Sequence, residues 1–268
     1  MLGRSRIPSY AALGLALVVL VAGAGCGGTG PSGAKPKAAP STTAPRATVT
    51  VLAAASLTDA FTEIGRSFEA ARPGTKVMFS FGASSSLATQ ANQGAPADLM
   101  ASADEANLQK VVDAGNASDP KVFARNRLAI LVAKGNPKEI KALPDLAQPG
   151  VDFVLCAPEV PCGKFGAQAL AKAGVAAKPR SYEENVKAVV TKVTLGEADA
   201  GIVYVTDVKA AGDRTEGVDI PDARNVVAVY PMAVLRQSGQ PDLARAFLDY
   251  VLSPAGQQVL ARYGFLPA

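Results

Sequence analysis

The chain has 268 residues, with 27 basic and 23 acidic side chains and no histidine, so its formal net charge is +4. The absence of histidine excludes Ser-His-Asp and Cys-His nucleophile pairs and every metal site that uses imidazole. Residues 1–46 hold five of the basic residues and none of the acidic ones, which leaves 22 basic and 23 acidic residues in the remainder. Because this remainder is nearly neutral, no basic surface for nucleic acid is expected.

Residues 1–25 have the pattern of a lipoprotein signal peptide. Arg4 and Arg6 form a basic N-terminal region, and an uninterrupted apolar run of 14 residues follows. This run is shorter than the roughly 20 residues that span a bilayer. The segment ends in Gly23-Ala-Gly-Cys26, which resembles a bacterial lipobox, although Gly23 replaces the usual leucine or valine. We therefore expect lipidation at Cys26. The alternative is an ordinary signal peptide in which this cysteine has no role.

Residues 26–46 are rich in Gly, Pro, Ser, Thr and Ala and carry no large apolar side chain. Such a segment cannot bury enough surface to offset the entropy lost on ordering, so it predicts a flexible linker. No later stretch reaches about 18 consecutive apolar residues, so nothing else is expected to span a membrane. The sequence thus predicts an extracytoplasmic monomer that is attached to the cell membrane by a lipid anchor only.

The rest of the chain alternates short apolar strands with amphipathic helices. Apolar and β-branched runs predict strands at 48–53, 76–81, 97–101, 127–133, 151–155, 200–205 and 225–230. Helical periodicity predicts helices at 56–72, 87–93, 108–114, 163–173, 183–194, shortly after 206, 243–252 and 255–263. Repeated strand–helix units predict an α/β fold in which mostly parallel sheets are covered by helices on both faces.

Four predicted strand-to-helix turns consist mostly of small or neutral residues, at 53–58, 82–86, 160–163 and 184–186. In α/β sheets, ligands bind at the carboxyl ends of strands, next to helix N-termini. The first N–H groups of a helix have no intrahelical partner and carry partial positive charge. Since small residues let an anion approach these donors closely, the four turns indicate an anion site.

Serine hydroxyls strengthen this interpretation. A single serine at a helix start is usually a structural cap, and Ser56 is a candidate for that role. The three consecutive serines from Ser84 to Ser86 are more than capping needs, and together with Ser56 they favour anion binding by neutral donors. Tyr204 ends a predicted buried strand, where it either adds a phenol donor or is a core tyrosine that bonds the backbone.

Two cysteines, Cys156 and Cys162, are separated by five residues that include two prolines. In an oxidising compartment a disulfide between them is possible, but the short spacing leaves two free thiols as an equal alternative. Zinc binding is not expected, because two thiols without histidine make an incomplete ligand set.

Several of these motifs together resemble the periplasmic molybdate-binding protein of an ABC importer. The matching segments are 51–60, 81–90, 94–99, 201–204 and 247–265. The resemblance extends in order over about residues 48–268. It implies a two-lobed, type II periplasmic-binding-protein fold, in which each lobe is a mostly parallel sheet flanked by helices and the ligand cleft lies between the lobes.

The resemblance also implies the ligand-binding residues. Ser56 and Ser84 match the family's hydroxyl ligands, and Tyr204 matches its tyrosine ligand. Cys162 and Val186 match positions that donate backbone N–H groups, although the family often has another small residue where Cys162 stands. The implied ligand is molybdate or tungstate. Molybdenum would therefore bind only as the oxyanion, and no cofactor is implied.

The implied mechanism is capture between two lobes and delivery to the membrane permease of an ABC importer. We expect lobe 1 to comprise 47–126 and 228–268 and lobe 2 to comprise 127–227, with hinges near 125–127 and 224–230. Because each lobe supplies part of the hydrogen-bond shell, ligand binding favours the closed state. Mo–O bonds are longer than S–O bonds, so cavity size would separate molybdate from sulfate. A pocket that offers only donors would disfavour protonated phosphate.

Two alternatives remain at this stage. The first is a carrier for another oxyanion, such as sulfate, on the same fold. The second is an exported serine hydrolase, since Ser118 and Lys121 match the S-x-x-K pattern. That pattern requires both residues on one helix, and Pro120 between them argues against a helix. We therefore expect a binding protein and no enzyme.

Overall fold

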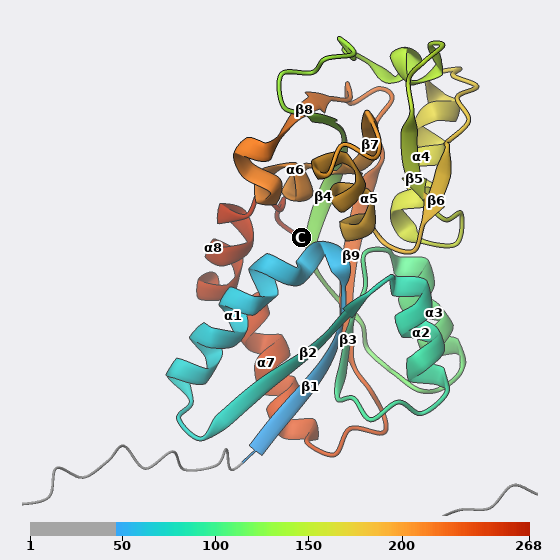
Figure 1. Ribbon diagram of the computed structural model, residues 1–268. Helices are drawn as coiled ribbons and strands as arrows, with labels where there is room; N and C mark the ends of the chain where they lie inside the picture. The colour runs from blue at the N-terminus through green and yellow to red at the C-terminus, as the bar shows by residue number, and fades with distance from the viewer. Residues whose placement is uncertain (1–46) are drawn as a thin grey trace, which may run out of the picture. The chain divides into compact units, whose positions relative to one another are not determined.

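The computed structural model describes residues 47–268, which are coloured by position in Figure 1. The predicted signal peptide, the lipidation site Cys26 and the linker 26–46 lie outside the described residues. Within the described part, no helix is both long and apolar enough to cross a membrane.

Strands and helices alternate along most of the chain. The strands are β1 (Ala47–Ala54), β2 (Thr75–Gly82), β3 (Leu99–Ala101), β4 (Lys121–Ala133), β5 (Phe153–Cys156), β6 (Ser181–Glu183), β7 (Ala200–Tyr204), β8 (Thr215–Asp219) and β9 (Val227–Val234). The α-helices are α1 (Thr58–Ala71), α2 (Ser84–Asn92), α3 (Glu105–Asp113), α4 (Pro161–Lys172), α5 (Val186–Thr194), α6 (Val205–Ala211), α7 (Pro241–Leu252) and α8 (Pro254–Arg262). Short 3-10 helices are η1 (Ala55–Leu57), η2 (Leu143–Ala147) and η3 (Gly212–Arg214).

The strands form a nine-stranded sheet with the order β2-β1-β3-β9-β4-β7-β5-β6, and β8 pairs with β4. β1 is parallel to β2 and β3, and β5 is parallel to β6 and β7. β9 is antiparallel to β3 and β4, and β4 is antiparallel to β7 and β8. The predicted parallel pairing is therefore confirmed at both ends of the sheet, whereas the strands that connect the ends run antiparallel.

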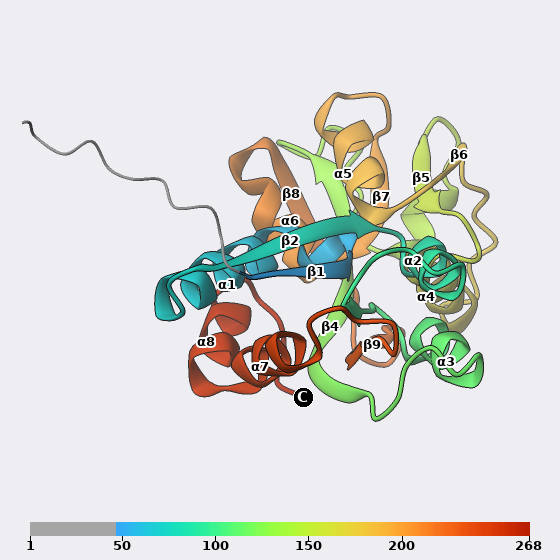
Figure 2. The same cartoon turned by 90° about the horizontal axis from the view of Figure 1, so that it is seen from below.

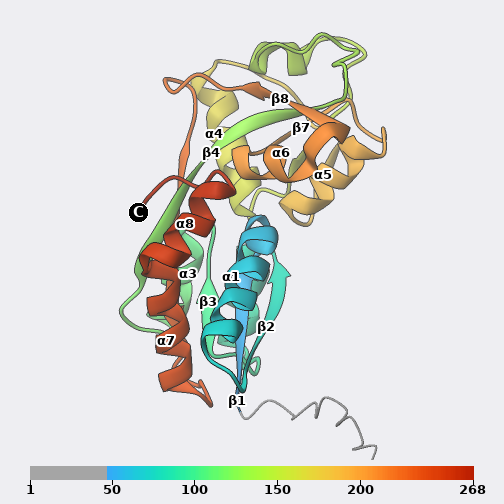
Figure 3. The same ribbon diagram turned by 90° about the vertical axis from the view of Figure 1, so that its left-hand side faces the viewer.

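β4 changes its partners along its length and so connects two groups of elements (Figures 1 and 3). Its residues 121–127 pair with β9, and its residues 128–133 pair with β7 and β8. We call β1–β3, β9, α1–α3, α7 and α8 the terminal group, because they contain the two ends of the described chain. We call β5–β8 and α4–α6 the middle group. Figure 2 shows α1, α7 and α8 on one side of β1 and β2, and α2 and α3 on the other.

Helices cover both faces of β1, which explains why its sequence is continuously apolar at its end. Successive side chains of a strand point to opposite faces. Val51 belongs to the same apolar cluster as Phe61 and Ile64 of α1, whereas Leu52 belongs to a second cluster with Leu87 of α2. A strand buried in this way reads as an apolar run instead of an alternating pattern.

The apolar stripe predicted for α1 is confirmed by the burial of Leu57, Phe61, Ile64 and Phe68, all of which are fully buried. The ring centroids of Phe61 and Phe68 lie 6.2 and 5.3 Å from that of Phe247 on α7, in edge-to-face orientation. Burial of each aromatic ring contributes roughly 2 kcal/mol. This packing fixes α1, and with it the preceding turn, against the terminal group.

Three differences from the sequence prediction have physical causes. The strands β6 and β8 were not predicted, because each is short and has mostly exposed or partly exposed side chains. β4 starts six residues before the expected position, at Lys121, because Lys121, Arg125 and Asn126 interrupt the apolar strand pattern there. α5 starts at Val186 instead of 183, because the side chain of Asn185 accepts the N–H of Ala188 and so caps the helix there.

Candidate anion-binding site

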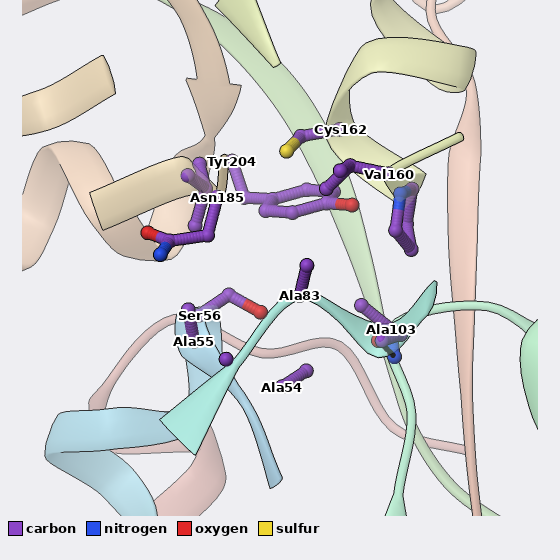
Figure 4. A pocket seen from close by; sticks show the side chains of 13 residues that line it. Ala54, Ala55, Ser56, Ala83, Ala103, Val160, Cys162, Asn185 and Tyr204 are labelled. Carbon is purple, nitrogen blue, oxygen red and sulfur yellow. Dashed lines mark hydrogen bonds between the residues drawn. The ribbon is translucent and has the colours of Figure 1, made fainter. Parts of the chain in front are cut away.

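A small pocket lies between the terminal and middle groups (Figure 4). It contains about 210 Å³ of space free of protein atoms, part of it open to solvent. The lining residues are Ala54, Ala55, Ser56, Gly82, Ala83, Ser84, Ala103, Val160, Pro161, Cys162, Asn185, Val186 and Tyr204. All five residues predicted to bind ligand are among them, and none of these 13 side chains carries a charge.

Ser56 lies in η1 directly after β1, and only 6% of it is exposed. Its hydroxyl does not cap α1. The N-cap residue of that helix is Leu57, and no side chain caps the helix. The cap predicted for Ser56 is therefore wrong: the 3-10 turn places its Oγ 2.9 Å from Tyr230 Oη instead. Figure 4 shows the same hydroxyl directed into the pocket, on the side opposite the ring of Tyr204.

Ser84 is the first residue of α2 and is 1% exposed. Its Oγ accepts the N–H of Ala103 at 2.9 Å. The N-cap of α2 is Ala83, whose side chain has no acceptor. The N–H groups in the first turn of α2 therefore receive no side-chain cap and have no intrahelical partner. The start of this helix can supply backbone donors as well as a hydroxyl.

The first turns of α4 and α5 bring the two predicted backbone donors to the pocket. Cys162 is the second residue of α4, and a disulfide joins it to Cys156 at the end of β5. Val186 is the first residue of α5. Because both residues lie in the first turn of a helix, their N–H groups have no carbonyl one turn earlier to bond.

Tyr204 ends β7 and is 1% exposed. Its Oη has no hydrogen-bond partner within residues 47–268, and its ring lies along the pocket in Figure 4. Burial raises the pKa of Tyr204 well above its usual value, and the neighbouring Tyr230 and Asp207 raise it further. The phenol therefore stays protonated near neutral pH. A buried hydroxyl without a partner costs roughly 1–3 kcal/mol, which a ligand oxygen could offset.

Two lysines near the pocket are paired with carboxylates. Lys187 Nζ on α5 lies 2.9 Å from Asp59 Oδ2 on α1 and 3.4 Å from Asp207 Oδ1 on α6. Lys164 Nζ on α4 lies 3.8 Å from Asp104 Oδ2, next to α3. Burial alone would lower the pKa of Lys187, but Asp207 and Asp59 outweigh this effect and raise it. These lysines join the two groups of elements and leave the pocket itself to neutral donors.

Comparison with known proteins identifies the family. The sequence model of the bacterial extracellular solute-binding protein family matches residues 49–266. The chain belongs to this family. The molybdate-binding protein ModA of Mycobacterium tuberculosis is 44% identical over 254 residues, which cover 94% of this chain and 96% of that protein. The molybdate-binding protein ModA of Haemophilus influenzae is 32% identical over 235 residues, which cover 82% and 90%.

A solved structure supports the fold of this solute-binding protein. The periplasmic molybdate-binding protein of Azotobacter vinelandii superposes with a TM-score of 0.74 and 20% identity, covering 82% of this chain and 99% of the other. At this identity the likeness concerns the fold alone. The predicted α/β periplasmic-binding-protein fold is thus confirmed.

The geometry of this solute-binding protein removes the basis of the hydrolase alternative. Asp119 has a φ of 52° and Lys121 is the first residue of β4, so Ser118 and Lys121 do not share a helix. Lys121 Nζ pairs instead with Asp119 Oδ1 at 2.7 Å. Within the described residues, no group of three or more His, Cys, Asp or Glu side chains is placed to hold a metal ion.

Two residues behind the pocket of this solute-binding protein were missed from the sequence. Tyr230 on β9 and Asn126 on β4 are both fully buried. Tyr230 Oη contacts Ser56 Oγ, and Asn126 Nδ2 lies 2.9 Å from Thr206 Oγ1. A buried amide needs hydrogen-bond partners, but Asn126 stands between Arg125 and Arg127, so its neighbours in the sequence gave no sign that it is buried.

Proposed function

We propose that this solute-binding protein captures molybdate, and also tungstate, in the pocket and delivers the anion to an ABC importer. The observation that carries the proposal is the convergence of five neutral donors, from Ser56, Ser84, Tyr204, Cys162 and Val186, in one uncharged pocket. The 44% identity to a molybdate-binding protein over 94% of the chain supports the choice of ligand.

The donors suit a small tetrahedral dianion. Hydroxyls and the N–H groups of helix first turns bind anions, and the helix dipoles of α2, α4 and α5 add favourable potential. No positive side chain has to lose its hydration to form this shell. Sulfate carries the same charge as molybdate but has shorter bonds, so the size of the pocket is the property that would separate the two.

Closure would follow from the division of donors between the two groups. Ser56 and Ser84 belong to the terminal group, whereas Cys162, Val186 and Tyr204 belong to the middle group. We propose 47–126 with 228–268 as one lobe and 127–227 as the other, supported by the change of partners along β4 between Arg127 and Leu128. A ligand that needs donors from both lobes stabilises the closed state relative to the open one.

The proposal includes attachment to the outer face of the cell membrane through a lipid on Cys26, as a monomer. It is supported by the basic region, the short apolar run and the lipobox-like end of residues 1–25. The permease of an ABC importer would then receive the anion from a protein that is held close to the membrane. Mass spectrometry of the membrane-bound protein tests this step, and an unmodified Cys26 would contradict it.

Isothermal calorimetry of the purified protein with molybdate, tungstate and sulfate tests the ligand. We expect tight binding of molybdate and tungstate and far weaker binding of sulfate. Absence of heat with molybdate would overturn the assignment. Equal affinity for sulfate would favour the alternative of a general oxyanion carrier on the same fold.

A further inference from the structure

The hydroxyl of Ser56 is the end of a buried chain of hydrogen bonds that starts at Asn126. The Oδ1 of Asn126 accepts the N–H of Arg127 at 3.0 Å, which fixes the orientation of the side-chain amide. Its Nδ2 then lies 2.9 Å from Thr206 Oγ1 and 3.5 Å from Tyr230 Oη. An amide nitrogen donates and cannot accept, so the second proton of this amide is directed to the phenol oxygen of Tyr230.

The donor direction of these hydrogen bonds continues from Tyr230 to Ser56. Tyr230 is fully buried, and burial raises its pKa well above the usual value, so its phenol keeps its proton. Tyr230 Oη lies 2.9 Å from Ser56 Oγ, and either hydroxyl of this pair can donate. Since Tyr230 Oη already accepts from Asn126, the arrangement in which each oxygen accepts one bond and donates one has Tyr230 donating to Ser56. Ser56 Oγ is then the acceptor in that bond, and the proton of Ser56 is left for the pocket.

We infer that Tyr230, oriented by Asn126, is a positioning residue that holds the Ser56 hydroxyl as a donor to the bound anion. The inference rests on the proposed function and deepens it. The second serine of the pocket is held in the same sense by the backbone, because Ser84 Oγ accepts the N–H of Ala103. In both serines one protein donor engages the oxygen, and the hydroxyl proton points to the ligand.

This arrangement determines which anions fit the pocket. A fully deprotonated oxyanion such as molybdate needs only donors. An anion that carries a proton, such as hydrogen arsenate, needs one acceptor as well. With Tyr230 donating to Ser56 Oγ, the serine proton is directed to the anion and opposes an anion proton at that point, so the chain of hydrogen bonds selects against protonated anions. Without the Tyr230 hydroxyl, Ser56 could accept as well as donate.

The variant Tyr230→Phe removes the hydroxyl and keeps the ring, whose centroid lies 6.2 Å from Phe123 and 5.4 Å from Phe265. We expect molybdate to bind roughly fivefold more weakly, which corresponds to about 1 kcal/mol for one oriented hydrogen bond. We also expect the ratio of molybdate to hydrogen arsenate affinity to fall, measured by competition at mildly alkaline pH. The control Tyr250→Phe removes a hydroxyl on α7, away from the pocket, and should change neither value.

A double-mutant cycle separates positioning from a general structural role. If Tyr230 acts through Ser56, Tyr230→Phe should cost nothing further in molybdate affinity once Ser56→Ala is present. Additive losses in the cycle, or an unchanged anion ratio in Tyr230→Phe, would overturn the inference. Any loss of fold stability by Tyr230→Phe is common to both backgrounds and cancels. Absence of molybdate binding by the unaltered protein would instead refute the proposed function.

Discussion

The hydroxyl of Ser84 contributes both to the stability of the fold and to the proposed binding of ligand. Its Oγ accepts the buried N–H of Ala103. We expect Ser84→Ala to weaken molybdate binding roughly 10- to 100-fold, because it removes a hydrogen bond to a charged group. We also expect the free energy of unfolding to fall by roughly 1–3 kcal/mol, because the N–H of Ala103 loses its acceptor. Calorimetry and thermal unfolding without ligand measure the two effects.

The matched control is Ser86→Ala, on the same helix. Ser86 is exposed and is not part of the pocket lining, so its hydroxyl should affect neither affinity nor stability. Normal molybdate binding by Ser84→Ala would remove Ser84 from the site. Unchanged stability would mean that the bond to Ala103 contributes nothing to the fold.

The individual residues differ in how far the sequence reveals them. The small-residue turns and the resemblance pointed to Ser56 and Ser84, because a local motif carries each of them. Tyr230 and Asn126 act through contacts with residues 174 and 80 positions away, namely Ser56 and Thr206. Contacts between such distant residues depend on the pairing of β4 with β9, which places both residues behind the pocket, and no local pattern encodes that pairing.

At the scale of elements, Lys187 ties α5 to α1 and α6. Its partner Asp207 is fully buried, and burial raises the pKa of that carboxyl, although Lys187 partly offsets the effect. We expect Lys187→Met to lower the free energy of unfolding by roughly 3 kcal/mol, since it leaves a buried carboxylate without a counter-charge. We also expect weaker molybdate binding, because the contact of Lys187 with Asp59 on α1 is lost. Chemical denaturation and calorimetry measure these changes.

A compensating substitution tests the cause of that loss. Adding Asp207→Asn to Lys187→Met removes the uncompensated charge and should restore most of the stability. The restored stability should not bring back the affinity, because the link to α1 is still absent. Lys121→Met serves as control: its pair with Asp119 is exposed, so its effect should stay within about 1 kcal/mol. No recovery in the double variant would contradict this account of Lys187.

Helices and strands with a strong apolar periodicity were predictable from the sequence. Strands that form only because they pair with an adjacent strand were not. The stripe of α1 follows directly from Phe61, Ile64 and Phe68. β8 has only the pairing with β4 to define it, and its residues are mostly exposed. The first part of β4 is likewise a strand because β9 lies beside it. Short strands of this kind gain their stability from pairing, which the sequence of one strand alone does not show.

At the scale of the whole molecule, the repeated strand–helix units did not predict that the centre of the sheet is antiparallel. Such units account for the parallel ends, where β1 and β5 each have two parallel neighbours. β4 and β9 instead run antiparallel to their neighbours, and β4 passes from the terminal group to the middle group. The same two strands carry Asn126 and Tyr230, so the connection between the groups also supports the pocket.

The pocket and its surroundings also predict how the whole protein responds to alkaline pH. The pKa values of Tyr204, Tyr230 and Lys187 are all raised in the folded state, from ordinary values near 10. Above that pH the unfolded chain releases these protons while the folded chain keeps them. The stability that they contribute is therefore fully present below about pH 10 and is lost as the pH rises further, by roughly 1.4 kcal/mol per pH unit for each group.

Comparison with Tyr230→Phe isolates one of the three groups. The other groups that face Tyr230, namely Ser56, Asn126, Tyr204 and Asp207, are present in both proteins. The difference in the free energy of unfolding between the unaltered protein and the variant should be constant below about pH 10. Above it, the advantage of the unaltered protein should shrink, because only its unfolded state releases the extra proton. Denaturant titrations across this range measure the difference, and an advantage that stays constant or grows would mean that Tyr230 ionises in the folded protein as readily as in the unfolded chain.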